Sequence, residues 1–164
     1  MPKQNENENK TTPKTNGISP VARHNARYYA LQAMYQWQIA GTAITDIEQA
    51  FVKKQIEKQT DIDYFKELLN QIPLHQPEID EAMLPFLARG LKEIDPVELA
   101  VLRLAIYELL KHPEIPYRVI INEALELAKK FGSIDGYKFV NGVLDRVAKK
   151  TRETEVNMGK PQRT

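Results

Sequence analysis

The stretch that decides the fold is D-P-V-E-L-A-V-L-R-L-A-I-Y-E-L-L-K, residues 95–111. It carries the start signal of a helix, because Asp95 is a favourable N-cap and Pro96 suits the first helical position. Glu98 can close a capping box and favours the positive end of the helix dipole. The apolar residues that follow cover more than half of the helix circumference. Such a helix is buried among its neighbours, so we expect it at the centre of the fold.

Arg103 lies in the apolar part of this stretch, between Leu102 and Leu104. A guanidinium in apolar surroundings needs a hydrogen-bonding partner. Glu98 and Tyr107 are the nearest candidates along the same helix. We therefore expect Arg103 at the edge of the buried face, paired with one of them.

Helical periodicity with start and stop residues predicts further helices on both sides, and the alternation typical of strands is absent. The predicted helices cover residues 19–40, 45–58, 60–72, 78–94, 116–131 and 133–150. Pro85 should kink or break the fourth of these. We expect Gly132 to end a helix in the left-handed conformation, and Gly142 to allow another backbone to approach closely. The fold class is therefore all-α, a compact bundle of six to seven helices.

Composition divides the chain into three parts. Residues 1–18 are polar with almost no apolar side chain, which predicts a disordered tail. Residues 19–150 form a single helical domain, and residues 151–164 are expected to be a loose basic tail. The chain has no cysteine, no apolar run of about 18 residues, and no apolar segment at its N-terminus that would indicate secretion. We expect a cytoplasmic protein without membrane contact.

The formal net charge of +1 is unevenly distributed. Residues 1–27 carry five basic and two acidic groups, and residues 146–164 carry six basic and two acidic groups. The body between them is consequently acidic. Basic ends on an acidic body indicate a polyanion partner, or charged tails that keep the protein in solution. Charge alone leaves both interpretations open.

Motifs for catalysis are absent from the sequence. It contains no phosphate-binding loop, no dinucleotide fingerprint and no H-E-x-x-H pair. Its histidines, His24, His75 and His112, are far apart, and a metal site would require them to converge. Ser19 and Ser133 are interpreted as helix caps rather than nucleophiles. We therefore expect no enzyme, no metal and no cofactor.

Four segments, taken in their order and spacing, identify a family resemblance. They are A-R-Y-Y-A-L-Q-A-M-Y-Q-W-Q (26–38), A-V-L-R-L-A-I-Y-E-L (100–109), P-Y-R-V-I-I-N-E-A-L-E-L-A-K-K-F-G (116–132) and K-F-V-N-G-V-L-D (138–145). Over roughly residues 20–150 the chain resembles the NusB family of bacterial transcription antitermination factors. The resemblance implies two helical subdomains and binding to boxA RNA, a short single-stranded element in ribosomal RNA leaders. It also implies a protein partner, the ribosomal protein NusE, with which the family helps to load the antitermination complex on RNA polymerase.

The resemblance further implies RNA-binding residues. The arginine-rich motif of the family falls on Arg23, His24, Asn25 and Arg27, where many members have an unbroken arginine run. The uncharged middle positions weaken the attraction for phosphates but can still form hydrogen bonds.

A second set of matched positions combines cations with an aromatic ring. Arg118, Lys138 and Phe139 match positions that the family places near RNA. A cation beside an aromatic ring suits unstacked single-stranded bases. Phe139 can equally be interpreted as a core aromatic.

Other matched positions concern the protein partner. Tyr35, Glu98 and Asp135 match positions associated with the NusE contact or its regulation, although Glu98 and Asp135 can also serve as helix caps.

Two alternatives to an RNA-binding adaptor remain at this point. The chain could be a protein-interaction scaffold with minor RNA binding, or a NusB-like domain related to ribosomal-RNA cytosine methyltransferases. The second alternative is disfavoured because the chain has no cysteine nucleophile and no glycine-rich strand–helix unit for a methyl donor.

Overall fold

The computed structural model describes residues 19–54 and 56–159; the predicted tail 1–18 and residues 160–164 lie outside this part of the chain. The described residues form helices and connecting loops and contain no strand, so the all-α prediction is confirmed. The elements are α1 (Pro20–Ala40), α2 (Ile44–Lys54), α3 (Ile62–Leu74), α4 (Gln76–Met83), η1 (Leu84–Phe86), η2 (Leu91–Glu93), α5 (Pro96–Lys111), α6 (Tyr117–Phe131), α7 (Gly136–Thr151) and α8 (Glu153–Met158).

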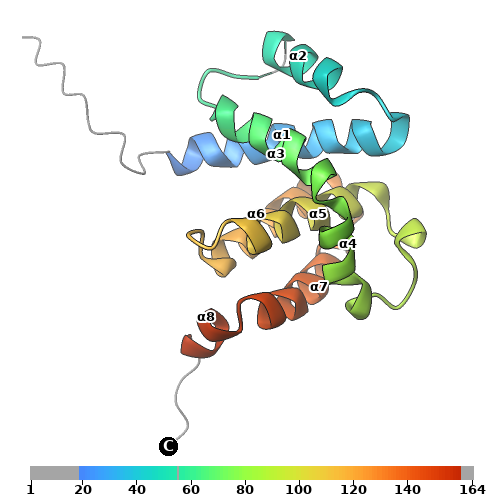
Figure 1. The fold of residues 1–164 in the computed structure, drawn as a ribbon, viewed down its shortest axis with the longest axis vertical. Helices are drawn as coiled ribbons and strands as arrows, with labels where there is room; N and C mark the ends of the chain where they lie inside the picture. The colour runs from blue at the N-terminus through green and yellow to red at the C-terminus, as the bar shows by residue number, and fades with distance from the viewer. Residues whose placement is uncertain (1–18, 55, 160–164) are drawn as a thin grey trace, which may run out of the picture.

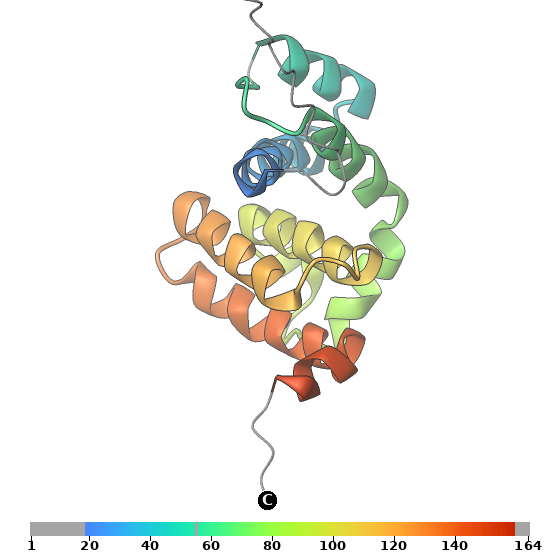
Figure 2. The ribbon, with the colours of Figure 1, turned by 90° about the vertical axis from the view of Figure 1, so that its left-hand side faces the viewer.

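The helices lie in two groups (Figure 1). α1, α2 and α3 form the upper group, and α5, α6 and α7 form the lower group, with α8 at its end. α4 leads from the upper group along the side of the lower one (Figure 2). α1 packs on α3 within its own group and on α5 in the other, so one apolar core runs through both groups. This arrangement agrees with the expected two helical subdomains in one compact bundle.

α5 is the buried centre of the fold, as its sequence predicts. The Asp95 carboxylate accepts hydrogen bonds from the backbone N–H groups of Val97 (2.9 Å) and Glu98 (3.2 Å), which caps the helix. Every residue from Ala100 to Leu109 is buried. Because neighbouring helices cover α5 on all sides, its charged side chains need partners from other helices.

Arg103 is one of these charged side chains, and its partners come from other helices. The expected pairing with Glu98 or Tyr107 on its own helix is therefore wrong. Its Nε and Nη2 donate to both carboxylate oxygens of Asp80 in α4, each at 3.0 Å. Its Nη1 donates to the side-chain oxygen of Gln38 in α1, also at 3.0 Å. The two-pronged geometry makes this a strong, charge-assisted contact that joins three helices.

Two glycines end helices in different ways. Gly41 ends α1 with φ 64°, the left-handed conformation that favours glycine. Gly132 ends α6 with φ −86° and ψ −176°, so the left-handed prediction for this residue is wrong. A side chain is excluded there for another reason, because its Cβ would lie 2.7 Å from the carbonyl oxygen of Ala128.

The expected close packing at Gly142 is also wrong, since nothing lies within 4 Å of a Cβ added there. Gly136 is the crowded position instead, because its Cβ would collide with the Glu98 carboxylate.

We expect Gly142→Ala to raise the free energy of unfolding by about 1 kcal/mol through helix propensity. Gly136→Ala should lower it by about 1–3 kcal/mol through overpacking. Urea unfolding of both variants checks this, and a change of the same sign in both would contradict it.

Two prolines lie at or near helix ends, and the predicted break at Pro85 is confirmed. The predicted helix 78–94 is broken at Pro85, since α4 ends at Met83 and the short turns η1 and η2 follow. Pro73 does not stop α3 but lies in its last turn.

Within residues 19–54 and 56–159, no helix combines the length and the apolar character needed to cross a membrane.

The C-terminal segment differs from the loose tail that composition predicts. Residues 153–158 form α8, and Arg152 before it is buried. The Arg152 guanidinium donates to the backbone carbonyls of Leu109 (2.9 Å), Ile115 (3.0 Å) and His112 (2.8 Å). These carbonyls belong to the end of α5 and the loop after it. The arginine provides a hydrogen-bond donor for the carbonyls of Leu109 and Ile115, and a second donor for that of His112, which also accepts from the Ile115 N–H. The segment is thereby anchored to the core.

Candidate nucleic-acid interface

Five of the seven predicted RNA-binding residues fall into two separate groups on the surface. We call the first the α1 cluster; it lies in the first two turns of α1 and consists of Arg23, His24 and Asn25. We call the second the α7 cluster; it lies in the first turn of α7 and consists of Lys138 and Phe139. Arg118, in the first turn of α6, belongs to neither group.

The two clusters lie near opposite ends of α1. Phe139 shares a surface hollow with Asp95, at the start of α5. The neighbouring Pro96 carbonyl accepts a hydrogen bond from Gln38, in the last turn of α1 (2.9 Å). With a rise of about 1.5 Å per residue, Arg23 and Gln38 are about 22 Å apart along the helix. An RNA strand that contacts both clusters would therefore have to extend along most of the length of α1.

Arg23 is held at the surface by two contacts. Its guanidinium carbon lies 3.8 Å from the centroid of the Tyr64 ring. Its Nε lies 3.4 Å from the Asp61 carboxylate, and 22% of the side chain is exposed. Stacking on the ring fixes the plane of the guanidinium. A phosphate can reach Arg23, but Asp61 already offsets part of its charge.

Arg27 is a core residue, although the family resemblance places it in the RNA-binding motif. Its Nε and Nη2 donate to the Glu108 carboxylate at 2.9 and 2.8 Å, and only 5% of the side chain is exposed. The Tyr64 hydroxyl donates to the same carboxylate. The structure therefore gives Arg27 a structural role in place of the expected phosphate contact.

The ionisation of this buried group follows from its surroundings. Burial alone lowers the pKa of Arg27, but the hydrogen bond and charge of Glu108 outweigh it and raise the pKa overall, so the guanidinium stays charged. Burial and then Glu108 raise the pKa of Tyr64, so its hydroxyl stays protonated and donates. The sequence alone does not predict that Arg27 and Tyr64 contact Glu108. The three residues lie on three different helices, α1, α3 and α5, and are far apart in the chain.

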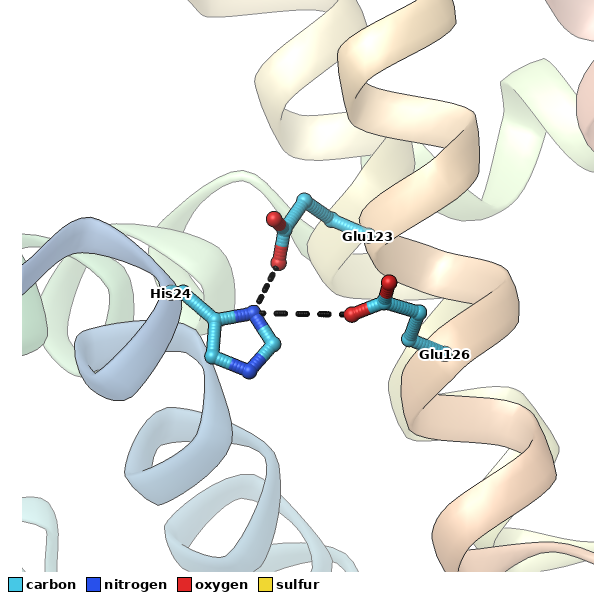
Figure 3. Close-up of side chains that lie close together, drawn as sticks. All are labelled: His24, Glu123 and Glu126. Carbon is cyan, nitrogen blue, oxygen red and sulfur yellow. Dashed lines mark hydrogen bonds and ion pairs between the residues drawn. The ribbon is translucent and has the colours of Figure 1, made fainter. Parts of the chain in front are cut away.

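His24 and Asn25 both contact neighbouring elements. His24 Nδ1 lies 2.6 Å from a carboxylate oxygen of Glu123 and 3.8 Å from one of Glu126, both on α6 (Figure 3). Asn25 donates to the backbone carbonyl of Gln59 at 2.9 Å. The carboxylates beside His24 weaken the attraction of the α1 cluster for phosphate.

The remaining predicted RNA-binding residues are at the surface. Arg118 is exposed and donates to the Tyr117 hydroxyl at 3.2 Å, a contact that raises the pKa of Arg118. Lys138 is exposed and lies 3.4 Å from Asp135. Phe139 is 39% exposed, so part of its ring is open to a base or a partner side chain.

The residues assigned to a protein partner differ in accessibility. Tyr35 is 40% exposed and lines a groove together with Phe51 and Phe131. Asp135 is exposed and forms no side-chain cap on α7. Glu98 is buried and accepts a hydrogen bond from the Ser133 hydroxyl at 2.7 Å. It closes no capping box, so that expectation is wrong. Glu98 lines the surface hollow that contains Phe139 with only a small exposed fraction, and its contact with a partner stays a prediction.

The three histidines do not converge. The rings of His75 and His112 both pack near Tyr107, with centroids 6.2 and 5.7 Å from the centroid of the tyrosine ring. His24, on α1, instead points toward Glu123 of α6. Within the described part of the chain, three side chains that could ligate a metal do meet: His24, Glu123 and Glu126. No signal in the sequence connects them, because His24 is about a hundred residues away from the two glutamates.

The fold and this surface define a small all-helical binding protein, in which a partly exposed arginine lies near one end of α1 and an exposed lysine with a partly exposed aromatic ring lies near the other end. The chain belongs to the NusB family, whose family model matches residues 24–149.

Relatives with this family name are similar over most of the chain. A "Transcription antitermination protein NusB" of Nitrosococcus oceani is 51% identical over 133 residues, covering 81% of this chain and 89% of the relative. The protein of the same name from Idiomarina loihiensis is 48% identical over 137 residues, covering 84% of this chain and 99% of the relative.

Two solved structures share the fold. T. maritima NusB has a TM-score of 0.69 and 30% identity, covering 82% of this chain and 96% of that chain. A chain in the crystal structure of antitermination factors NusB and NusE in complex with dsRNA has a TM-score of 0.72 and 26% identity, covering 80% of this chain and 99% of that chain.

Proposed function

We propose that this chain is a transcription antitermination factor that binds boxA-type single-stranded RNA together with the ribosomal protein NusE. In this function it helps to load the antitermination complex on RNA polymerase, acts in the cytoplasm and catalyses no reaction. The observation that carries the proposal is the identity of about 50% to proteins named for antitermination, over more than 80% of this chain. A solved neighbour in which NusB and NusE occur together with dsRNA supports RNA and NusE as the two partners.

The surface chemistry suits RNA at both clusters. In the α1 cluster, Arg23 presents the edge of a guanidinium whose face is stacked on Tyr64. In the α7 cluster, Lys138 stands beside the partly exposed ring of Phe139. In the α7 cluster a base can stack on Phe139 while Lys138 meets a phosphate. The Tyr64 ring is buried, so the α1 cluster offers RNA the charge of Arg23 and no ring.

The same surface explains why a second protein is needed. Arg23 faces Asp61, Lys138 faces Asp135, and Arg27 is buried against Glu108. Few phosphates can therefore be neutralised, and binding by this chain alone should be weak and sensitive to salt. A partner that holds the same RNA raises its effective concentration at this surface. NusE fits this role as a source of additional contacts.

The direct test is a titration of the chain with three labelled RNAs: a boxA-type single strand, a scrambled strand of the same composition, and the boxA-type strand in a duplex. The proposal predicts that the boxA-type single strand binds more tightly than either control. Equal affinity for the boxA-type and scrambled strands would contradict sequence-specific binding and would favour the protein-interaction scaffold.

Arg23 provides a prediction for the phosphate contacts. Arg23→Ala should flatten the dependence of log affinity on log salt concentration by about 0.7, because one phosphate is no longer neutralised. The matched control is Lys54→Ala, which removes an exposed cation at the end of α2. Fluorescence anisotropy at four salt concentrations measures both slopes. An unchanged slope in Arg23→Ala would show that Arg23 contacts no phosphate.

A further inference from the structure

We propose that His24, Glu123 and Glu126 form a binding site for a divalent transition-metal ion, with Zn²⁺ as the representative ion. The three side chains point toward one another across the space between α1 and α6 (Figure 3). Their potential ligand atoms all lie within 4.8 Å of one another. Metal binding here goes beyond the RNA-binding function and does not depend on it.

The positions of the donor atoms are close to those that a tetrahedral ion needs. Ligand bonds of about 2.0–2.2 Å place neighbouring donor atoms about 3.3 Å apart. In the structure His24 Nδ1 lies 2.6 Å from a carboxylate oxygen of Glu123 and 3.8 Å from one of Glu126. Metal binding would therefore lengthen the distance to Glu123 by about 0.7 Å and shorten the distance to Glu126 by about 0.5 Å. Glu126 is mostly exposed and can make this adjustment by a change of side-chain rotamer.

The helix register explains why both carboxylates reach one imidazole. Glu123 and Glu126 are three residues apart on α6 and therefore share one face of the helix. That face lies opposite the first turns of α1, where His24 projects. Three protein ligands from two helices leave a fourth position for water, as in zinc sites with an open coordination position.

The chemistry of the donors selects the class of ion. One imidazole with two carboxylates suits Zn²⁺ and its neighbours in the first transition series, whereas Mg²⁺ and Ca²⁺ prefer oxygen ligands alone. The two carboxylates supply negative charge at the site, which a divalent ion would balance. A bound ion would also link α1 of the upper group to α6 of the lower group.

The test is calorimetric titration of the full chain, without an affinity tag, with Zn²⁺ in a buffer that does not chelate metals. We expect one saturable site. His24→Ala and the isosteric Glu126→Gln should each weaken the affinity by more than about tenfold. The matched control is His75→Gln, because His75 is a half-exposed histidine with a single carboxylate, Glu78, at 3.7 Å. This variant should bind Zn²⁺ like the parent.

A second readout follows from linkage. Zn²⁺ at a hundred times its dissociation constant should raise the ratio of folded to unfolded protein by about a hundredfold in the parent. Glu126→Gln, whose side chain is largely in solvent, should fold normally and keep at most about a tenth of this effect at the same Zn²⁺ concentration. Absence of saturable binding would overturn the proposal. Binding that survives both His24→Ala and Glu126→Gln would place the ion elsewhere and would overturn it as well.

Discussion

Arg27→Ala is expected to lower the free energy of unfolding by about 3–5 kcal/mol, because it leaves a buried carboxylate without its cation. Glu108 is almost completely buried and holds both Arg27 and the Tyr64 hydroxyl. Without the guanidinium, the carboxylate must stay charged in an apolar place or take up a proton. Both outcomes favour the unfolded chain, in which water solvates the carboxylate.

Urea unfolding of Arg27→Ala measures this destabilisation, and Arg89→Ala is the matched control. Arg89 is 80% exposed and forms a surface ion pair with Glu93, so its removal should change stability by less than about 0.5 kcal/mol. The double change Arg27→Met with Glu108→Leu should recover much of the stability, because apolar side chains of similar size often replace a buried ion pair without cost. A decrease below about 1 kcal/mol in Arg27→Ala would contradict the structural role.

Arg103→Ala is expected to cause a destabilisation of similar size, about 3–5 kcal/mol, for the same physical reason. The arginine binds both oxygens of Asp80 and also Gln38. Its removal leaves a nearly buried carboxylate without its cation, with only the Gln76 amide donating to it, and loosens the packing among α1, α4 and α5. In a domain of this size we expect the midpoint of thermal unfolding to fall by about 10 °C.

Circular dichroism during heating checks the Arg103 prediction. The matched control is Lys149→Ala, which removes one member of an exposed pair with Asp145 on α7. That variant should unfold within about 2 °C of the parent, since exposed pairs contribute little. Equal midpoints for the Arg103 and Lys149 variants would contradict a stabilising role of the buried pair.

The fold was largely predictable because its signals are local. The Asp95–Pro96 start of α5 and the end of α1 at Gly41 depend on a few adjacent residues, and both lie where the sequence predicts them. The exceptions involve residues whose partners come from elsewhere in the chain. Arg103 pairs with Asp80, 23 residues away, and Arg152 binds carbonyls more than 35 residues away. Helical periodicity carries no information about such partners.

The candidate site shows the same limit. The family resemblance assigned Arg23 and Arg27 to one basic motif, and the two residues do share a face of α1. One turn along the helix changes their surroundings, however, because Tyr64 from α3 and Glu108 from α5 cover Arg27. Arg23, nearer the start of α1, remains partly exposed. Glu98 likewise points into the protein because the loop before α7 packs over it.

The convergence of His24 with Glu123 and Glu126 could not be foreseen in the same way. The two glutamates follow from helical spacing once α6 is known. Their position opposite His24 depends on how α1 crosses α6, which is set by side chains throughout the core.

The most direct test of the central claim is the affinity of this chain for a boxA-type single strand, measured without NusE and with NusE at saturation. We predict tighter binding with NusE, because a second set of contacts holds the same RNA. Thermodynamic reciprocity requires that the RNA tighten NusE binding to this chain by the same factor, which a third titration measures. Equal RNA affinity with and without NusE would contradict cooperative binding and would identify the chain as an independent RNA binder.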